Sequence, residues 1–201
     1  MFKGLNTTVQ IAHHCLEAYL EPGGVAVDAT VGNGQDTLFL ARMVGHRGHI
    51  YGFDIQEQAL RSAGKLLTEN GYGEIAQLIL IGHENMAQYV KQPVDVITFN
   101  LGYLPGGDRF VTTCPDSTLK AVKTGLGLLK PGGIMSIVVY TGHPGGYEEQ
   151  QQLESCLHRL DKKEFCVSKL DVINRENAPY LIMIDKNNVL PGRVGLENSE
   201  T

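Results

Sequence analysis

The chain has 201 residues, with 17 Lys and Arg against 22 Asp and Glu and a formal net charge of −5 at pH 7. Its length fits one domain with its own hydrophobic core, which excludes the small scaffolds that depend on disulfides. A composition of 42% hydrophobic and 19% charged residues excludes a disordered acidic chain. The acidic balance also argues against broad non-specific nucleic-acid binding, which relies on many Lys and Arg, so we expect any RNA contact to be local.

The chain carries no sequence signal of a membrane segment. The longest nearly uninterrupted apolar run, Ile134 to Tyr140, is far below the roughly 18 residues of a membrane span. Residues 1–6 lack the apolar stretch of a signal peptide, so a cytoplasmic protein is expected. The four cysteines form no C-x-x-C pair, which predicts reduced thiols and no metal site: Cys15, Cys114, Cys156 and Cys166.

The first half of the chain alternates helical and strand patterns. Thr7 and Gln10 have the spacing of a capping box, and apolar residues then recur at helical intervals until Pro22-Gly23-Gly24, which predicts a helix before the first strand. Continuous apolar runs and helical periods then follow in turn. They predict strands at 25–29, 49–54 and 75–81, and helices at 36–41 and 56–70.

The second half continues the alternation and closes with a hairpin. It predicts a strand at 94–100, a long loop, a helix at 117–129, a turn at 131–133, a strand at 134–140 and a helix at 147–160. The runs 165–172 and 180–185 are too close for a parallel crossover, which needs a dozen or more residues, so the last strand is expected to be antiparallel. The whole pattern predicts a single-domain, doubly wound, mostly parallel seven-stranded α/β sheet over residues 1–186. Residues 187–201 are expected to form a flexible tail.

The ends of the first two strands carry residues suited to a nucleotide-like ligand. Such sheets bind ligands beyond the carboxyl ends of their strands. Gly32 and Gly34 allow a tight turn and a close backbone approach, but Thr37 stands where a dinucleotide fingerprint needs a third glycine, which disfavours NAD. Asp54 ends the second strand 20 residues beyond Gly34 and can accept hydrogen bonds from both ribose hydroxyls. The alternative is that Asp54 caps the helix that begins near Gln56.

Two later strand ends add polar groups. Residues 82–85, Gly-His-Glu-Asn, can meet the edge of an adenine, although a polar loop is ordinary at this place in any soluble protein. Residues 100–108, N-L-G-Y-L-P-G-G-D, join an amide that both donates and accepts to a flexible turn and an aromatic ring. Such a segment can hold a planar amine-bearing group with its nitrogen aimed at a neighbouring electrophile.

Together these motifs resemble the class I S-adenosylmethionine-dependent methyltransferases. The loop 28–37 is similar to their glycine-rich motif, and Asn100-Leu101-Gly102-Tyr103 is similar to the N-P-P-Y motif of amino-methyltransferases, with Leu-Gly in place of Pro-Pro. More narrowly, residues 100–108, S-T-x-K-A at 117–121 and V-V-Y-x-G-H-x-G-G at 138–146 resemble the family long labelled rRNA methylases, the YtqB or MnmM group. The resemblance implies S-adenosyl-L-methionine as cofactor and tRNA as partner. It also implies methylation of the 5-aminomethyl group of 2-thiouridine at the wobble position.

The cofactor is expected to lie against residues of the four strand ends and the loops that follow them. These are Asp28, Thr30, Gly32, Asn33, Gly34, Asp36, Thr37, Asp54, Gln56, His83, Glu84, Asn85, Asn100 and Gly102.

An alkyl amine is protonated at neutral pH, so its attack on a methyl group needs a base. We expect Asn100 and the carbonyl of Leu101 to orient the amine and Tyr103 to pack against the nucleobase. Asp108 or His143 is the candidate that removes or relays the proton. A histidine in a turn bonded to the backbone is the alternative for His143, and a solvated loop carboxylate is the alternative for Asp108.

Several residues are candidates for substrate contact around this site. Thr118, Lys120 and above all Arg109 are candidates for RNA phosphate, although a solvated helix face is the alternative for Lys120. Tyr140, Asn177 and Tyr180 are expected to line the substrate opening.

Two other functions stay open on the residues alone. The same cofactor site could serve an rRNA or small-amine methyltransferase, and the acidic charge favours the small-amine version. A nucleotide-binding or NAD-dependent protein on a similar sheet is the third reading. The oligomeric state is left open, with a homodimer as one option.

Overall fold

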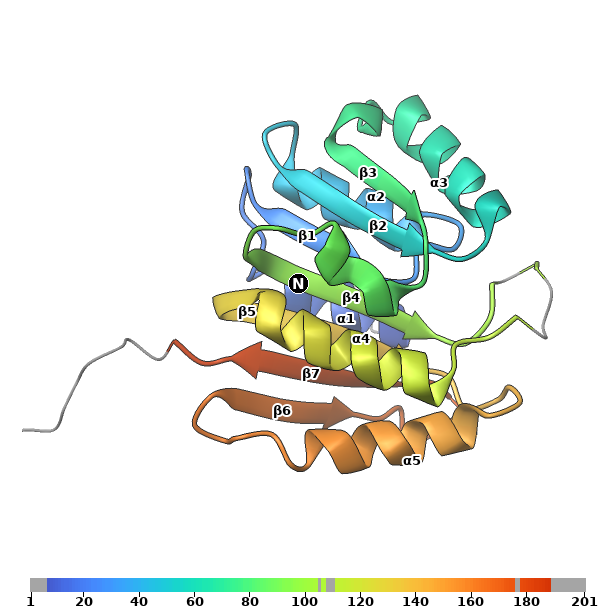
Figure 1. Ribbon diagram of the computed structural model, residues 1–201, viewed down its shortest axis with the longest axis vertical. Helices are drawn as coiled ribbons and strands as arrows, with labels where there is room; N and C mark the ends of the chain where they lie inside the picture. Colours follow the sequence, from blue (N-terminus) through green and yellow to red (C-terminus); the bar gives the residue numbers. More distant parts are fainter. Residues whose placement is uncertain (1–6, 105, 108–110, 176–177, 189–201) are drawn as a thin grey trace, which may run out of the picture.

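The chain is organised around one seven-stranded sheet (Figure 1). The structure is a computed structural model that describes residues 7–104, 106–107, 111–175 and 178–188. The strands lie in the order β3-β2-β1-β4-β5-β7-β6. Their bounds are β1 Val25–Asp28, β2 His49–Asp54, β3 Ala76–Leu80, β4 Val94–Leu101, β5 Leu129–Val139, β6 Phe165–Leu170 and β7 Tyr180–Lys186. Strands β1 to β5 pair in parallel, and β7 is antiparallel to both β5 and β6. The predicted doubly wound α/β sheet with an antiparallel last strand is therefore confirmed.

Helices cover both faces of the sheet (Figure 1). Within the described residues they are α1 Thr8–Leu16, α2 Gln35–Val44, α3 Glu57–Glu69, α4 Pro115–Leu128, α5 Gly146–Leu157 and the 3-10 helices η1 Gly73–Ile75 and η2 His83–Gln88. Buried residues of α1, α2 and α3 form one hydrophobic cluster with the sheet. Buried residues of η2, α4 and α5 form a second cluster on the opposite face. A parallel sheet covered in this way needs apolar side chains on both faces, which explains why its strands are nearly continuous apolar runs.

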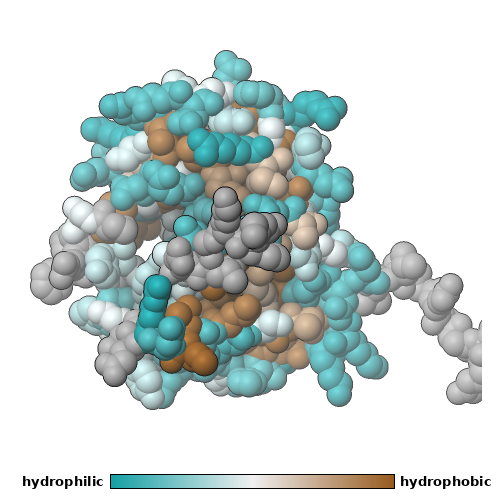
Figure 2. Space-filling view, turned by 180° about the vertical axis from the view of Figure 1, so that it is seen from behind, coloured by the Kyte–Doolittle hydropathy of each residue, from teal (hydrophilic) through white to brown (hydrophobic). Residues whose placement is uncertain are grey.

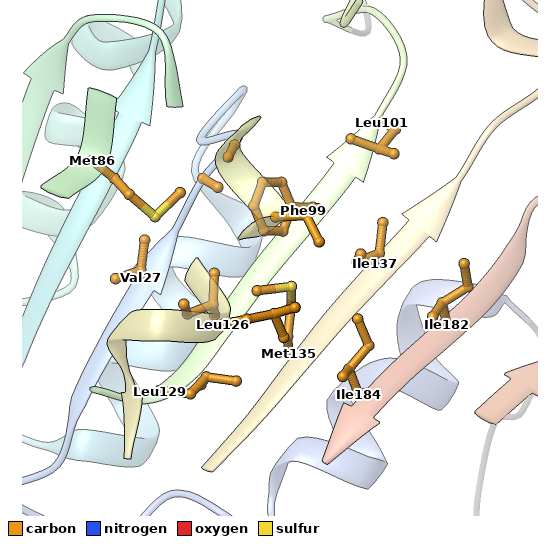
Figure 3. Packing of buried hydrophobic residues seen from close by; sticks show 14 of the residues in the cluster. Val27, Met86, Phe99, Leu101, Leu126, Leu129, Met135, Ile137, Ile182 and Ile184 are labelled. Carbon is orange, nitrogen blue, oxygen red and sulfur yellow. The ribbon is translucent and has the colours of Figure 1, made fainter. Parts of the chain in front are cut away.

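The α4 side of the core is tightly packed (Figure 3). Phe99 of β4 and Met135 of β5 are completely or almost completely buried and lie beside Leu126 of α4. Helix α4 approaches the sheet at Gly125, where an added Cβ would lie only 2.7 Å from the Met135 Cε atom. A larger residue at position 125 would push this helix off the sheet, since interiors at native density tolerate little added volume.

The opposite face carries α1 and α2 behind the sheet. Helix α1 packs against β5 and β7, so the first described helix lies close to the last strand along the chain. Viewed from behind, the surface consists mainly of hydrophilic residues with hydrophobic ones exposed between them (Figure 2). Within the described ranges, no helix combines the length and the apolar character that crossing a membrane requires.

Local signals fix several element ends, and most observed bounds lie within a few residues of the prediction, with larger or more informative differences at α1, α4 and β5. The Thr7 hydroxyl accepts from the Gln10 N–H and caps α1 as expected, but α1 ends at Leu16, before the predicted stop. Helix α4 begins two residues early because Pro115, with its fixed φ and missing N–H, suits a first turn. The Pro131-Gly132-Gly133 segment, predicted as a turn before β5, lies inside that strand, where the register with β4 shifts. Gly132 allows this because its φ is +78°. The predicted tail at 187–201 lies almost wholly outside the described residues and stays a prediction.

Candidate active site

Two adjoining cavities lie beyond the carboxyl ends of β1 and β4. These neighbouring strands are where the strand order reverses, since the chain proceeds from β1 to β2 and β3 on one side and from β4 to β5 on the other. Cavity A, about 150 Å³, is lined by residues that include Asp54, Gln56, His83 and Glu84. Cavity B, about 740 Å³, is lined by residues that include Asn33, Gln35, Asp36 and Tyr140. Both cavities share the wall formed by Thr30, Gly32, Asn100, Gly102 and Tyr103.

The loop after β1 turns through two glycines in the left-handed region. Gly32 has φ +51° and Gly34 has φ +81°, a conformation that side chains with a Cβ rarely adopt. At Gly34 packing also excludes a larger residue, because an added Cβ would lie 2.7 Å from the Cα and Cβ atoms of Ala63 in α3. Gly32 lines both cavities, whereas Gly34, which was expected to contact the cofactor, lines neither of them and instead lets the loop pack closely against α3.

Asp54 joins this loop to the end of β2. Its Oδ2 accepts from the Gly32 N–H at 2.9 Å, and its Oδ1 accepts from the Gln56 N–H at 2.9 Å. Asp54 thus has the local role at the start of α3 that the alternative reading gave it, and it also lines cavity A. Because each carboxylate oxygen has more than one acceptor position, Asp54 keeps the capacity to bind hydroxyl donors from the cavity.

Asp28 and Thr37 support the loop from behind and do not contact the cavities. Both side chains are fully buried. Asp28 accepts from the Thr37 hydroxyl at 2.6 Å and from the Thr30 N–H at 3.2 Å. Burial, followed by the charge of Asp36, raises the pKa of Asp28 to about 7. The expectation that Asp28 and Thr37 touch the cofactor is therefore corrected: neither lines a cavity.

The segment after β3 contributes to cavity A through His83 and Glu84. The Nδ1 atom of His83 lies 3.1 Å from the carbonyl oxygen of Ala29, so this nitrogen carries the proton and donates it. Burial lowers the pKa of His83, which keeps the ring neutral. Glu84 accepts from the Asn85 side-chain amide at 2.9 Å. Asn85 was expected to contact the cofactor, but it lines neither cavity because its amide turns back to Glu84 and to its own turn.

Asn100 is held in one orientation at the shared wall. Its Nδ2 donates to Asp36 Oδ2 at 2.5 Å, and its backbone N–H donates to the Thr30 hydroxyl at 2.7 Å. A carboxylate only accepts hydrogen bonds, so the amide nitrogen must face Asp36 and the amide oxygen must face away from it. That oxygen is buried and has no hydrogen-bond partner among the described residues. A buried acceptor without a partner costs free energy, which is typical of a group that a ligand completes.

The sequence interpretation missed His13. Its Nε2 lies 2.7 Å from Asp36 Oδ1, and its ring stacks on Phe39 with centroids 3.8 Å apart and planes 2° apart. The side chains of His13, Asp36 and Asn100 therefore form a hydrogen-bonded chain from α1 to the end of β4. No motif in the sequence joins these residues, because the contact depends on how α1 packs against α2.

The residues expected to contact the substrate differ in their exposure to cavity B. Tyr103 and Tyr140 line cavity B and keep 40% and 37% of their surface exposed. Burial, followed by the charge of Asp36, raises the pKa of Tyr140. The side chain of Leu101 lies in the core instead, and its carbonyl, expected to orient the amine, accepts from the Tyr140 N–H at 3.2 Å.

His143 and Thr118 lie beneath the site around Glu149. The buried Glu149 carboxylate accepts from the Thr118 hydroxyl at 2.5 Å and from the Thr113 hydroxyl at 2.8 Å. His143 Nε2 lies 3.8 Å from Glu149, and His143 Nδ1 lies 3.0 Å from the Pro144 carbonyl. Neither His143 nor Thr118 lines a cavity. Thr118 has no exposed surface, so it cannot meet an RNA phosphate, and the backbone-bonded reading of His143 matches its position.

The remaining candidates are scattered or lie outside the described residues. Tyr180 was expected to line the substrate opening, but it is 5% exposed and packs under Lys169, whose Nζ lies 4.0 Å from its ring centroid. Lys120 is exposed on α4. Asp108, Arg109 and Asn177 lie outside the described residues. Among the residues that the structure describes, no three His, Cys, Asp or Glu side chains are grouped to hold a metal ion.

Comparison with known proteins settles the family. The family model described as "Putative rRNA methylase" matches residues 50–186. The chain belongs to this family. It is also 37% identical over 193 residues to a chloroplastic tRNA (mnm5s2U34)-methyltransferase of Arabidopsis thaliana, covering 91% of this chain and 70% of that protein.

Solved structures agree with the family assignment. A Clostridium thermocellum structure described as "putative rRNA-methylase" is 39% identical, with a TM-score of 0.89 over 92% of this chain and 100% of that chain. The Streptococcus mutans protein SMU.1697c, solved in complex with SAH, is 36% identical, with a TM-score of 0.82 over 92% of this chain and 99% of that chain. The predicted methyltransferase activity and the predicted family are thereby confirmed.

Proposed function

We propose that this methyltransferase transfers a methyl group from S-adenosylmethionine to the amine of a 5-aminomethyl-2-thiouridine at the wobble position of tRNA. Its family and its likeness to a tRNA (mnm5s2U34)-methyltransferase over 91% of the chain support this substrate. The observation that carries the proposal is the orientation of Asn100. Its amide oxygen is a buried acceptor at the wall between cavities A and B, suited to an N–H of the incoming amine.

The residues present fit the cofactor. Cavity A offers the Asp54 carboxylate for a pair of hydroxyls, and at Gly32 the loop after β1 places backbone without a side chain against the cavity. His83 and Glu84 supply further polar groups in the lining of the same cavity. The SAH bound to SMU.1697c, which shares the fold and 36% of the sequence, supports the same kind of ligand here.

The protein's part in the reaction is to position and to select. Bound S-adenosylmethionine supplies an electrophilic methyl group on a sulfonium. Asn100 accepts one N–H of the amine, which fixes the direction of its lone pair, and such orientation supplies several kcal/mol of the barrier. Tyr103 and Tyr140 present aromatic faces at the mouth of cavity B, where a nucleobase can pack against them. Because the chain is acidic overall, we expect the RNA contacts to be local and to centre on this mouth.

The decisive experiment is methylation in vitro followed by nucleoside mass spectrometry. The acceptors are tRNA whose wobble uridine carries the aminomethyl and 2-thio groups, the same tRNA without the aminomethyl group, and ribosomal RNA. We expect one added methyl group on the first acceptor only. A free aminomethyl-2-thiouridine nucleoside is assayed as a fourth acceptor. Methylation of ribosomal RNA, or of this nucleoside as fast as the intact tRNA, would replace the tRNA proposal by one of the alternatives.

A pair of asparagine variants tests the role of the site. Asn100→Ala removes the buried acceptor and is expected to lower kcat roughly a hundredfold through lost positioning. Asn85→Ala is the matched control, because Asn85 follows a strand end but lines neither cavity. Equal turnover of both variants would contradict the placement of the amine at Asn100.

A further inference from the structure

The side chain of Asp36 lies at the centre of a hydrogen-bonded chain that joins cavity B to α1. Its Oδ2 accepts from Asn100 at 2.5 Å, and its Oδ1 faces His13 Nε2 at 2.7 Å. Asp36 lines cavity B, and its side chain is 16% exposed. It is therefore a carboxylate that a ligand in cavity B can reach, next to the amide that the proposed amine would contact.

The proposed methyl acceptor has to lose a proton in the active site before it can react. An alkyl amine is an ammonium ion at neutral pH and has no lone pair until it loses a proton. Of the two bases expected from the sequence, His143 is bonded to the backbone through Nδ1, its buried Nε2 lies 3.8 Å from Glu149, and it lines neither cavity. Asp108 lies outside the described residues. Among the described residues that line cavity B, Asp36 is the one with a carboxylate side chain.

We propose that Asp36 accepts the proton of the substrate ammonium and that His13 is a positioning residue that acts through Asp36. This inference rests on the proposed amine substrate. In the step, an N–H bond of the ammonium breaks and its electron pair stays on nitrogen as the attacking lone pair. The proton forms an O–H bond on Asp36, and it leaves to solvent after product release.

The contacts of His13 hold the Asp36 carboxylate in one orientation. Its ring stacks flat on Phe39, which fixes the ring plane, and its Nε2 occupies one carboxylate oxygen. The other oxygen keeps an acceptor position beside Asn100. This assignment changes the role of Asp36 from the cofactor contact expected from the sequence to a catalytic base, and it gives α1 a part in the active site.

Other charged groups surround the pair and have to be considered when pH is varied. Asp28 lies behind Asp36, and the two carboxyls interact electrostatically. Tyr140 faces Asp36 from the end of β5, and the charge of Asp36 contributes to its raised pKa. On α1 itself, His14 lies 3.4 Å from Glu17 and forms a separate contact.

The test compares Asp36→Asn with the wild-type protein across pH. The asparagine keeps the shape and one acceptor but cannot take a proton. At saturating S-adenosylmethionine we expect kcat of this variant to fall at least a hundredfold near pH 7 and then to rise about tenfold per pH unit, since only the neutral fraction of the amine reacts. The wild-type rate should level off at lower pH. The affinity for S-adenosylmethionine, measured by calorimetry, should stay within about threefold of the wild-type value.

Variants on α1 separate positioning from structure. His13→Ala should lower kcat about tenfold with the cofactor affinity unchanged, and His13→Gln, whose amide can still donate to Asp36, should recover most of it. His14→Gln is the matched control on the same helix and should behave as wild type. Circular dichroism and thermal unfolding establish that each variant is folded.

The outcomes distinguish this inference from the proposed function. If the wild-type protein does not methylate the aminomethyl tRNA, the proposed function fails first. If it does, and Asp36→Asn keeps the wild-type rate and pH profile, the base assignment alone is overturned. A variant that mainly loses cofactor affinity, with kcat intact, would return Asp36 to the role of a cofactor contact.

Discussion

The backbone N–H of Gly32 donates to Oδ2 of Asp54 at 2.9 Å. One carboxylate thereby joins the glycine-rich loop after β1 to the end of β2, 22 residues further along the chain. The same carboxylate accepts from the Gln56 N–H at the start of α3. A residue expected to bind a ribose is thus also part of the scaffold of its own cavity, and its replacement should affect both roles.

Asp54→Asn should weaken cofactor binding more than it weakens the fold. The amide has one acceptor oxygen in place of two, so the variant keeps at most one of the two backbone bonds and loses the negative charge that favours hydroxyl donors. We expect the affinity for S-adenosylmethionine to fall about tenfold or more. The stabilisation of the protein by the cofactor in a thermal-shift measurement should shrink accordingly.

Asp161→Asn is the matched control for this change. Asp161 also accepts from a backbone N–H two residues further on, that of Lys163, at 2.8 Å, but it is exposed and lines neither cavity. Its replacement should leave cofactor affinity unaltered. Equal loss in both variants would mean that Asp54 acts only through the local turn.

The sheet could be read from the sequence because its signals are local. Apolar runs marked seven strands, and the short connection between 170 and 180 required an antiparallel pair, as β6 and β7 have. Asp54 and Asn100 could be placed near one edge of the sheet for the same reason, since each lies at the carboxyl end of a predicted parallel strand.

The contacts between helices could not be read in the same way. Thr118 looked like a phosphate contact because it begins a helix, yet Glu149, 31 residues further on, buries it. His13 meets Asp36 only because α1, packed on β5 and β7, lies beside α2 in the folded protein. Such pairs depend on tertiary packing, and the periodicity of a single segment cannot predict which helices come into contact.

Gly34→Ala should destabilise the protein more than Gly145→Ala. Both glycines precede the first residue of a helix in the left-handed region, with φ +81° and ψ of +10° and −10°, so each substitution carries a conformational cost of about 1 kcal/mol. Only at Gly34 does the new Cβ meet other atoms, 2.7 Å from Ala63, whereas nothing lies within 4 Å at Gly145. Overpacking adds roughly 1–3 kcal/mol, which urea unfolding can measure. Equal losses would show that α3 moves away without cost.

Glu149→Ala should cost about 2–4 kcal/mol of unfolding free energy. The substitution leaves the hydroxyls of Thr113 and Thr118 without their acceptor and opens a cavity between α4 and α5. Glu149→Gln should cost about 1 kcal/mol or less, because its amide can accept from one threonine and donate to the other. Glu148→Ala, on the exposed side of α5, should change stability by at most about 0.5 kcal/mol.

A functional consequence of Glu149 follows from Thr113. The Thr113 N–H donates to the Gly102 carbonyl at 2.9 Å, next to the shared wall of the cavities. We therefore expect Glu149→Ala to raise the KM for tRNA even at temperatures where the variant is folded, while Glu148→Ala leaves it unchanged. A variant with wild-type KM would separate this network from the substrate side of the site.

Asp28 should make stability depend on pH between about 4 and 7. The pKa of this carboxyl is raised from 3.8 to about 7 in the folded protein, first by burial and then by the charge of Asp36. The folded state therefore holds the proton more tightly than the unfolded state does. The resulting stability is fully present below about pH 4, is lost as pH rises toward 7 and is gone above it. At roughly 1.4 kcal/mol per pKa unit, the change amounts to a few kcal/mol.

Asp28→Asn isolates this contribution, because the other titrating groups are common to both proteins. The amide oxygen of the variant can accept from the Thr30 N–H, and its nitrogen can donate to the Thr37 hydroxyl. Both hydrogen bonds of Asp28 can therefore form in the variant, the second with its direction reversed. The difference in unfolding free energy, wild type minus variant, should fall steadily from pH 4 to pH 7 and stay level above it, as followed by urea unfolding at each pH. A difference that is flat across this range would mean that Asp28 is already charged in the folded protein at pH 4. The loop after β1 would then be held by a buried carboxylate anion rather than by a neutral carboxyl group.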